Sequence, residues 1–380
     1  MKILWIPQIS SKSLDGELML NKDSNFAFLI NLIKGGLAKS NNLLVCFEYM
    51  VEKEKIEIEL DYVCNEKRKF RSAQLERIDF DQDYFRKVIN DFAPDVIVLN
   101  EPYKVSQLKI LIDNMGLNNA PKIVAYVHWL AMDNYKSIKY SQYENMSNAD
   151  LALVNSDYVI SRFDKFAFDH NLFRLQDARA LPPSFDYDYY SKPKEIKSKN
   201  IIYNHRLSSD EYYLDAFDNL VSILSEVEKF DNVKMPTVYL TNPSGKDISK
   251  FLVKPYFKEL KLGSQEEYYN YLKSENVNIH LNTFFESKGM WSMSTVESGA
   301  TGNLCLLPYR FGYAEIFDKN YYGYCDTKSE MIIKLRNVLL DLVPTYSSSL
   351  FDNSCLKKWS NKSLSIKLTK FLYDIIDFGV

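Results

Sequence analysis

The chain has 380 residues, of which 46% are hydrophobic and 26% charged, and its formal net charge is −3. This length exceeds one ordinary hydrophobic core and fits two α/β lobes, while the composition excludes a disordered chain. The apolar runs are of strand length and too short to cross a bilayer, and the slightly acidic balance argues against a surface coated with positive charge for tight nucleic-acid binding.

The N-terminal segment 1–7 lacks the long apolar region of a signal peptide and predicts a first β-strand. The cysteines are odd in number and form no CxxC pair, which indicates reduced, mostly buried thiols. We therefore expect a cytoplasmic protein without stable membrane insertion. The five cysteines are Cys46, Cys64, Cys305, Cys325 and Cys355.

In the first half, short apolar runs alternate with helical patterns, which is typical of parallel sheets wrapped by helices. The charged, alternating segment 53–80 predicts an extra hairpin or strand. The predicted strands are 2–6, 43–48, 95–99, 123–128 and 151–155, and the predicted helices include 25–38 and 83–91.

Two prolines at 182–183 and a lysine-rich run at 191–200 predict a linker, after which the pattern restarts. We expect an α/β protein with two Rossmann-like doubly wound parallel-sheet domains, 1–185 and 186–360, facing a central cleft, and a closing helix within 361–380. The predicted elements of the second half are strands 200–204, 237–241, 277–281 and 304–308, helices 211–229, 264–274 and 292–300, and a last helix 361–376.

The segment 282–308 is the most informative part of the sequence, and it predicts a strand, a loop, a helix, a glycine and a strand in that order. A helix start offers backbone N–H groups and the positive end of the helix dipole, which suits a diphosphate. Glu297, within this helix, could accept hydrogen bonds from ribose hydroxyls. Gly302 would permit a sharp exit into the next strand.

This segment resembles the donor motif of retaining GT-B glycosyltransferases of the family 4 type, in which a glutamate, seven residues and a second glutamate precede a small residue and a glycine. Glu297, Ala300 and Gly302 match, whereas Gly289 stands where the first glutamate is expected and Glu286 lies further upstream. The resemblance implies the GT-B fold for the two Rossmann-like domains. It also implies transfer of a sugar from a nucleotide sugar with retention, without a metal ion or another cofactor.

A second match opens the second half, where the first strand leads into His205 and Arg206. In the resembled family an arginine here clamps the donor phosphates, and a guanidinium can bind two phosphate oxygens at once. The lysine expected five residues on is Glu211, and Lys288 could replace it. The His-Arg pair and the segment 309–317 also resemble transferases that glycosylate queuosine in tRNA and phage enzymes that modify DNA.

Candidate residues of the first half follow its strands. His128 ends the strand 123–128, and the resemblance implies that it lies beside the donor sugar and the acceptor. Asn155 either lines the cleft or belongs to a helix cap, and the loop that holds Lys22 and Asp23 follows the first strand. On the acceptor side we expect Lys22, Asp23, Trp129, Asp133 and Asn155.

His128, Arg206 and Glu286 are the expected catalytic residues. The structural alternatives are a structural histidine for His128, a surface ion pair for Arg206 and an ordinary exposed helix glutamate for Glu297. We predict no metal ligands, since the four histidines show no metal spacing. The expected donor-binding residues are His205, Arg206, Lys288, Met290, Trp291, Ser292, Thr295 and Glu297.

The favoured acceptor is a hydroxymethylated base in nucleic acid, as in phage DNA modification, with a UDP- or GDP-sugar as donor and DNA or tRNA as partner. Aromatic and lysine side chains within 129–143 could stack bases and neutralise phosphates. One alternative is a surface-polysaccharide or lipopolysaccharide transferase. Another is a nucleotide-sugar-binding protein without catalysis, which Gly289 and Glu211 would suit.

Overall fold

The computed structural model describes residues 1–7, 24–47, 58–59, 69–70, 73–74, 82–100, 104–127, 132–133, 137–191, 198–242, 245, 247–286, 291–343 and 353–377. The chain divides into two compact units, and each is described by itself. Unit 1 comprises Met1–Phe185 and Trp359–Val380, so the C-terminal helix returns to it, and unit 2 comprises Asp186–Lys358. Among the described helices, none combines the length and the apolar character needed to cross a membrane.

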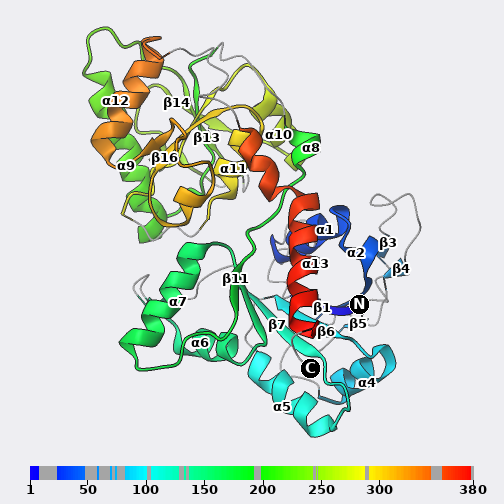
Figure 1. The fold of residues 1–380 in the computed structure, drawn as a ribbon. Coiled ribbons are helices and arrows are strands. Elements are labelled where there is room, and N and C mark those ends of the chain that lie inside the picture. The colour runs from blue at the N-terminus through cyan, green and yellow to red at the C-terminus, as the bar shows by residue number, and fades with distance from the viewer. Residues whose placement is uncertain are drawn as a thin grey trace. The chain divides into compact units, whose positions relative to one another are not determined.

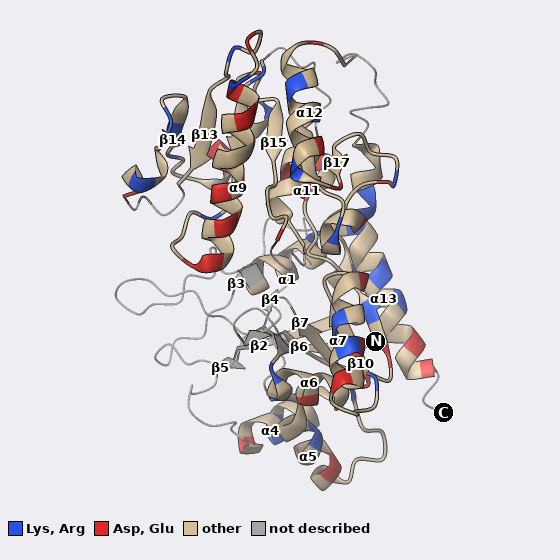
Figure 2. Ribbon diagram, turned by 90° about the vertical axis from the view of Figure 1, so that its left-hand side faces the viewer, with Lys and Arg blue, Asp and Glu red and all other residues tan. Residues whose placement is uncertain are grey.

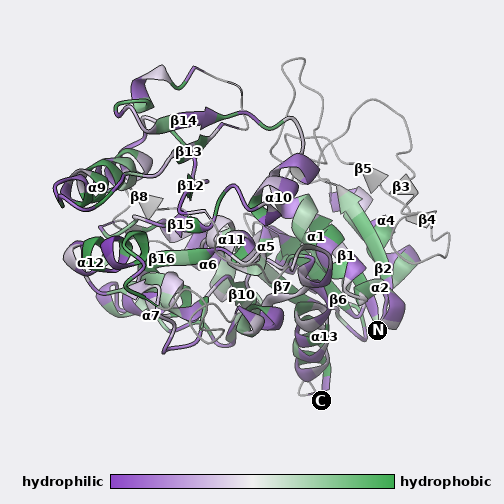
Figure 3. Ribbon diagram, turned by 90° about the horizontal axis from the view of Figure 1, so that it is seen from above, coloured by the Kyte–Doolittle hydropathy of each residue, from purple (hydrophilic) through white to green (hydrophobic). Residues whose placement is uncertain are grey.

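Unit 1 contains a seven-stranded sheet in the order β11-β10-β7-β6-β1-β2-β5, in which every paired neighbour is parallel (Figure 1). Its central strands are buried on both faces and therefore read as continuous apolar runs, green in Figure 3. The strands are β1 (Lys2–Pro7), β2 (Asn42–Phe47), β5 (Ala73–Gln74), β6 (Val96–Asn100), β7 (Lys122–Val127), β10 (Leu151–Val154) and β11 (Ala178–Ala180).

Two short antiparallel pairs accompany this sheet, and one of them lies in the segment where the sequence predicts an extra hairpin or strand. The first pair is β3 (Ile58–Glu59) with β4 (Lys69–Phe70), and the second is β8 (Met132–Asp133) with β9 (Ser137–Ile138). The helices of unit 1 are α1 (Ser24–Lys34), α2 (Leu37–Ser40), α4 (Gln82–Phe92), α5 (Val105–Met115), α6 (Tyr140–Ser147), α7 (Asp157–Asp169) and α13 (Asn361–Asp377).

The prediction of one continuous helix over 25–38 is wrong, because two glycines divide it into α1 and α2. Gly36 has φ +110°, a left-handed value that a helix interior does not adopt. At Gly35 a Cβ atom would lie 2.0 Å from the backbone oxygen of Asn361. The glycine pair therefore turns the chain and lets the end of α1 approach the start of α13 closely.

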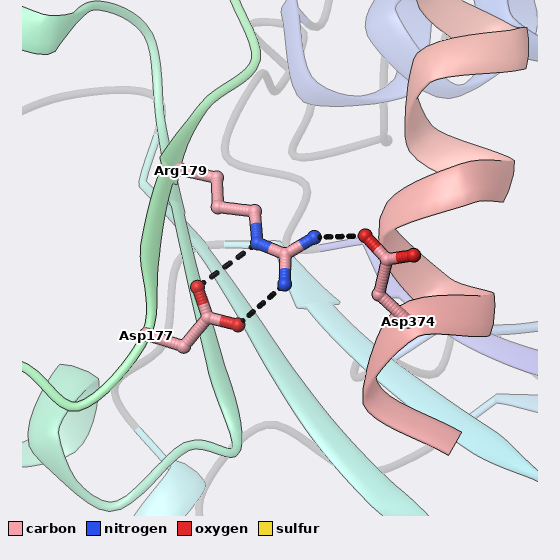
Figure 4. A network of polar contacts seen from close by, with 3 residues as sticks. All are labelled: Asp177, Arg179 and Asp374. Atoms are coloured by element: carbon pink, nitrogen blue, oxygen red, sulfur yellow. Dashed lines mark hydrogen bonds and ion pairs between the residues drawn. The ribbon is translucent and has the colours of Figure 1, made fainter. Parts of the chain in front are cut away.

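Helix α13 is fixed to unit 1 by apolar packing and by an ion-pair network. Leu364, Leu368 and Leu372 are buried in the same core as α1. Arg179 on β11 binds Asp177 through two hydrogen bonds of 2.9 and 2.8 Å, and Asp374 on α13 through a third of 2.7 Å (Figure 4). The network therefore joins an edge strand to a helix 195 residues further along the chain.

Unit 2 contains a six-stranded sheet in the order β14-β13-β12-β15-β16-β17, again with parallel neighbours throughout. One helix beside it, α9, carries acidic residues along its length (red in Figure 2). The strands are β12 (Ile201–Tyr203), β13 (Val238–Thr241), β14 (Phe257–Leu260), β15 (Ile279–Leu281), β16 (Leu304–Pro308) and β17 (Tyr324–Cys325). The helices are α8 (Tyr187–Tyr190), α9 (Glu211–Glu228), α10 (Gln265–Lys273), α11 (Met293–Ala300) and α12 (Lys328–Leu339), with 3-10 turns at Ser249–Phe251, Phe311–Glu315 and Ser354–Trp359.

Candidate functional site

The candidate site of unit 2 is built on α11, which lies between β15 and β16 in the chain. Ser292 caps this helix, and its Oγ accepts a hydrogen bond of 3.2 Å from the backbone N–H of Thr295. The N–H groups of Met293 and Ser294 precede the first hydrogen bond within the helix, so helix geometry directs them out of its end. The start of α11 thus has the donor arrangement that an anion requires.

The other end of α11 leaves through Gly302, as the sequence predicts. Gly302 has φ +85°, its N–H donates to Gly299 O at 2.9 Å, and the N–H of Asn303 donates to Ser298 O at 3.0 Å. These two bonds form a Schellman motif, which ends a helix through one left-handed residue. Both ends of α11 are therefore determined by nearby residues, Ser292 at the start and Gly302 after the end.

A buried polar network fixes the loop that enters α11. Thr295 Oγ1 lies 2.8 Å from Ser292 Oγ, 3.0 Å from His280 Nε2 and 3.2 Å from Asn282 Nδ2. All four side chains are buried. Because burying polar atoms is favourable only when they are hydrogen-bonded, this network selects one position for the helix start on the end of β15.

His205, which follows β12, reaches the first turn of α11. Its Nδ1 lies 3.1 Å from Ser294 Oγ, and its ring packs against Phe284 with centroids 4.9 Å apart. Burial lowers the pKa of His205 to about 3. The ring is therefore neutral at physiological pH, and its Nδ1 can accept the Ser294 hydroxyl proton.

Arg206 differs from its neighbour because its side chain is exposed. The guanidinium lies 5.7 Å from the ring centroid of Tyr213, a cation–π distance. His205 thus joins β12 to α11, whereas Arg206 presents a positive charge next to that junction.

Glu297 lies in the second turn of α11, and its carboxylate accepts hydrogen bonds from two tyrosine hydroxyls of α10. Tyr269 Oη donates to Oε1 at 2.6 Å and Tyr268 Oη to Oε2 at 3.1 Å. Burial raises the pKa of Glu297 to about 7, and the two tyrosine hydrogen bonds oppose the rise. The carboxylate is therefore not the ordinary exposed helix glutamate of the plain structural reading.

Glu286, the expected upstream glutamate, is exposed and forms a 3.4 Å ion pair with Lys328. Trp291 is partly buried directly before the cap of α11. In the segment 309–317, Arg310 donates to two backbone carbonyls, Phe285 O at 3.1 Å and Asp326 O at 2.7 Å. Arg310 therefore connects the loop that follows β15 to the loop that follows β17, which is a structural role within unit 2.

In unit 1, Asn155 is buried between β10 and α7, and its Oδ1 accepts a 3.2 Å hydrogen bond from Ser156 Oγ. Ser156 caps α7 by accepting from Val159 N–H. Asp133 lies in the short strand β8. The remaining predicted residues, Lys22, Asp23, His128, Trp129, Lys288 and Met290, lie outside the described residues, as does Gly289.

The sequence reasoning missed Asn204, Ser294 and the two tyrosines of α10. Asn204 Nδ2 donates to Tyr268 Oη, to Ser294 O and to Ser298 Oγ, so it links β12 to both helices. A signal existed for Asn204, which ends a parallel strand, the edge where ligands bind in such sheets. Within the described ranges, no group of three His, Cys, Asp or Glu side chains is placed to hold a metal ion.

No protein-family profile and no curated protein matches this sequence. Several solved structures resemble the whole chain. Sucrose-phosphate synthase from Thermosynechococcus elongatus has a TM-score of 0.68 at 10% identity, covering 100% of both chains. The lipopolysaccharide outer core galactosyltransferase WaaB has a TM-score of 0.68 at 14% identity, covering 98% of this chain and 99% of its own. Anabaena HepE in complex with UDP and glucose has a TM-score of 0.66 at 13% identity, covering 98% of this chain and 100% of its own.

These similarities, together with two sheets of parallel neighbours, confirm the predicted fold class. The chain has the GT-B fold, in which each unit is Rossmann-like.

Proposed function

We propose that the protein is a glycosyltransferase that moves a sugar from a nucleotide-sugar donor to an acceptor hydroxyl, with retention and without a metal ion. The observation that carries the proposal is the junction in unit 2 where β12 meets the start of α11 through His205 and Ser294. It joins an exposed arginine, a capped helix start and a carboxylate within one unit. These are the groups that a diphosphate and a ribose need.

In this proposal the donor diphosphate lies at the start of α11, where the N–H groups of Met293 and Ser294 and the guanidinium of Arg206 neutralise its charge. The same groups stabilise the nucleoside diphosphate as it leaves, since its negative charge grows as the glycosidic bond breaks. Glu297 accepts the ribose hydroxyls. The similar HepE structure was solved with UDP-glucose, which favours a uridine nucleotide as the first donor to test.

His128 and Glu286 are proposed to act at the sugar, and Lys288, Met290, Trp291, Ser292 and Thr295 to line the donor site. Lys22, Asp23, Trp129, Asp133 and Asn155 are proposed for the acceptor side. These roles rest on the sequence resemblance, which also assigns residues 1–185 to the acceptor and residues 186–360 to the donor.

For the acceptor we propose a hydroxymethylated base in DNA, because the His205-Arg206 pair and the segment 309–317 resemble enzymes that glycosylate modified bases. A second candidate is a lipopolysaccharide or polysaccharide hydroxyl. It is favoured by the likeness to WaaB, which is a lipopolysaccharide outer core galactosyltransferase.

The test begins with a thermal-shift screen of UDP-, GDP- and ADP-sugars, because a true donor stabilises the protein by mass action. Release of nucleoside diphosphate from the best donor is then measured with hydroxymethylated DNA, unmodified DNA or a lipopolysaccharide core oligosaccharide. Transfer to the first acceptor alone supports both parts of the proposal, and transfer to the oligosaccharide alone selects the second candidate. A protein that binds the donor but releases no diphosphate with any acceptor, and hydrolyses none without one, contradicts catalysis.

The stereochemical part needs a separate readout. The anomeric configuration of the product, measured by NMR coupling constants and compared with that of the donor, should be unchanged. An inverted product contradicts retention but leaves the donor site in place.

A further inference from the structure

Glu297 is held by two tyrosines that follow each other in one helix. Tyr269 Oη donates to one carboxylate oxygen at 2.6 Å and Tyr268 Oη to the other at 3.1 Å. Tyr269 is almost fully buried, at 3% exposure, whereas Glu297 keeps some exposure. The two hydroxyls therefore hold the carboxylate from its buried side.

The position of α10 is itself fixed, so the tyrosines form a rigid support. Ser264 caps this helix by accepting a 3.1 Å hydrogen bond from Glu267 N–H. Leu272 packs with Tyr269 in a core cluster under β12. Behind Tyr268, Asn204 Nδ2 donates to the tyrosine oxygen and also to Ser298 Oγ at 3.1 Å, which connects the tyrosine to α11 itself.

An ionised carboxylate has about four acceptor positions, two on each oxygen. Tyr268 and Tyr269 use one position on each oxygen, and each oxygen has one more. Two acceptors side by side match a vicinal diol, such as the 2′- and 3′-hydroxyls of a ribose. Turning this carboxylate away from the diol would break its hydrogen bonds to two fixed donors and would therefore cost free energy.

We propose that Tyr268 and Tyr269, supported by Asn204, are positioning residues that hold the Glu297 carboxylate for the ribose diol and so make the site select ribonucleotides over 2′-deoxyribonucleotides. This inference rests on the proposed function and names residues for its donor site that the sequence resemblance does not supply. The competing interpretation is that the tyrosines only join α10 to α11. That role affects folding but has no reason to depend on the 2′-hydroxyl.

The charge of Glu297 provides an independent signature. Burial raises the pKa of this carboxyl to about 7, and the hydrogen bonds from Tyr269 and Tyr268 oppose the rise. Burial also raises the pKa of Tyr268 well above its usual range, so its hydroxyl remains a donor at neutral pH. The facing groups are Tyr268 and Tyr269 from α10, with Asn204 and Cys305 beyond Tyr268. Removing one hydroxyl should therefore raise the pKa of Glu297 further.

The test compares Tyr269→Phe and Tyr268→Phe with Tyr271→Phe as the matched control, in the full-length protein. Tyr271 is on the same helix, but its ring packs edge-on against Tyr239, with centroids 5.5 Å apart, rather than against Glu297. Affinities for UDP and 2′-deoxy-UDP, and for GDP and 2′-deoxy-GDP, are measured by titration calorimetry at pH 6, 7 and 8. Wild type is expected to prefer the better ribonucleotide over its deoxy form by about tenfold or more, as one hydrogen bond to a charged group warrants.

For Tyr269→Phe we expect this preference to fall about five- to tenfold, with the deoxynucleotide affinity changed less than about twofold. The pH at which ribonucleotide binding is half lost should move upward, because binding needs the ionised carboxylate. Tyr271→Phe should keep both quantities. If the Phe variants fold poorly, Glu297→Gln, which keeps the side-chain shape, should abolish the preference in a folded protein.

The possible negative results distinguish a failure of the proposed function from a failure of this inference. If no nucleotide binds wild type, the proposed function and this inference are both wrong. If wild type binds UDP or GDP but shows no 2′-hydroxyl preference, or if the Phe variants weaken the ribo and deoxy forms equally, the positioning role is wrong and the proposed function stands. Loss of the preference in Tyr269→Phe but not in Tyr271→Phe supports the inference.

Discussion

His205 Nδ1 and Ser294 Oγ lie 3.1 Å apart and join the end of β12 to the first turn of α11. The two residues are 89 positions apart in the sequence. The next residue, Arg206, is exposed, and its guanidinium lies 5.7 Å from the ring centroid of Tyr213 on α9. An arginine and the free N–H groups of a helix start are both groups that bind a diphosphate, which leads to the first prediction.

Replacing Arg206 by alanine should weaken binding of UDP far more than binding of uridine. The guanidinium is expected to contact the diphosphate, so its removal should cost about ten- to a hundredfold in UDP affinity, the range for a charge-assisted hydrogen bond. Calorimetric titration of both ligands checks this. Arg174→Ala, which removes an exposed arginine from unit 1, is the control and should change neither affinity. Equal losses for UDP and uridine would contradict the assignment.

Replacing Ser292 by alanine should remove the cap of α11 and lower both stability and diphosphate affinity. Loss of an N-cap costs about 0.5–2 kcal/mol in the free energy of unfolding. Thr327→Ala is the control, because Thr327 caps another helix of unit 2, α12, by the equivalent bond from Glu330 N–H. Urea unfolding should show a loss for both variants, and the loss should be larger for Ser292→Ala because the buried Ser292 Oγ also bonds Thr295 Oγ1. Only Ser292→Ala should bind UDP more weakly; a similar decrease in Thr327→Ala would show that the effect is general.

Replacing Gly302 by alanine should destabilise the protein by about 1–2 kcal/mol, because its φ of +85° is unfavourable for a residue with a Cβ atom. Asparagine tolerates left-handed backbone better than alanine. Gly302→Asn should therefore lose less stability than Gly302→Ala, as measured by urea unfolding. Equal losses would mean that the space around this position, and not its backbone conformation, sets the cost.

The raised pKa of Glu297 predicts a pH-dependent stability. In the folded protein this carboxyl keeps its proton up to about pH 7, whereas the unfolded chain loses it near 4.5. Between these values the unfolded state binds fewer protons, so the free energy of unfolding falls as pH rises. The contribution is at most about 3 kcal/mol.

Glu297→Gln removes this titration and should therefore gain stability relative to wild type from pH 5 to pH 8. His205 acts in the opposite direction, since its lowered pKa reduces stability as pH falls below about 6.5, but it is present in both proteins and cancels. Urea unfolding at four pH values measures the difference. Parallel curves for the two proteins would contradict the raised pKa.

Arg179 should stabilise unit 1 through its three hydrogen bonds to Asp177 and Asp374 (Figure 4). Its side chain is only 24% exposed, so Arg179→Ala should lower the free energy of unfolding by about 1–3 kcal/mol. Lysine keeps the charge but not the forked geometry, and Arg179→Lys should recover part of the loss. The control is Lys165→Ala, which removes an exposed pair with Asp169 and should cost less than about 0.5 kcal/mol.

Local signals made much of α11 and its sheet predictable. The helix expected over 292–300, the sharp exit at Gly302 and the apolar run of β16 depend on signals within a few residues, and the structure reproduces each of them. The break between α1 and α2 was missed although Gly35 and Gly36 mark it, because the apolar periodicity continues across them.

Contacts between distant segments were not predictable. Tyr268 and Tyr269 are 29 and 28 residues from Glu297, and their convergence depends on how α10 packs beside α11. The sequence also did not show that His205 is buried and Arg206 exposed. This difference arises because the rings of Phe284 and His280 pack around His205.

The central claim is that a nucleoside diphosphate binds at the start of α11. Hydrogen–deuterium exchange of the full-length protein, with and without saturating UDP or GDP, tests it directly because bound phosphate slows exchange of the N–H groups it engages. We expect the peptide spanning Trp291 to Glu297 to be among the most protected, with little change in α12. Binding of either nucleotide without protection of that peptide, or failure of both to bind, would contradict the claim.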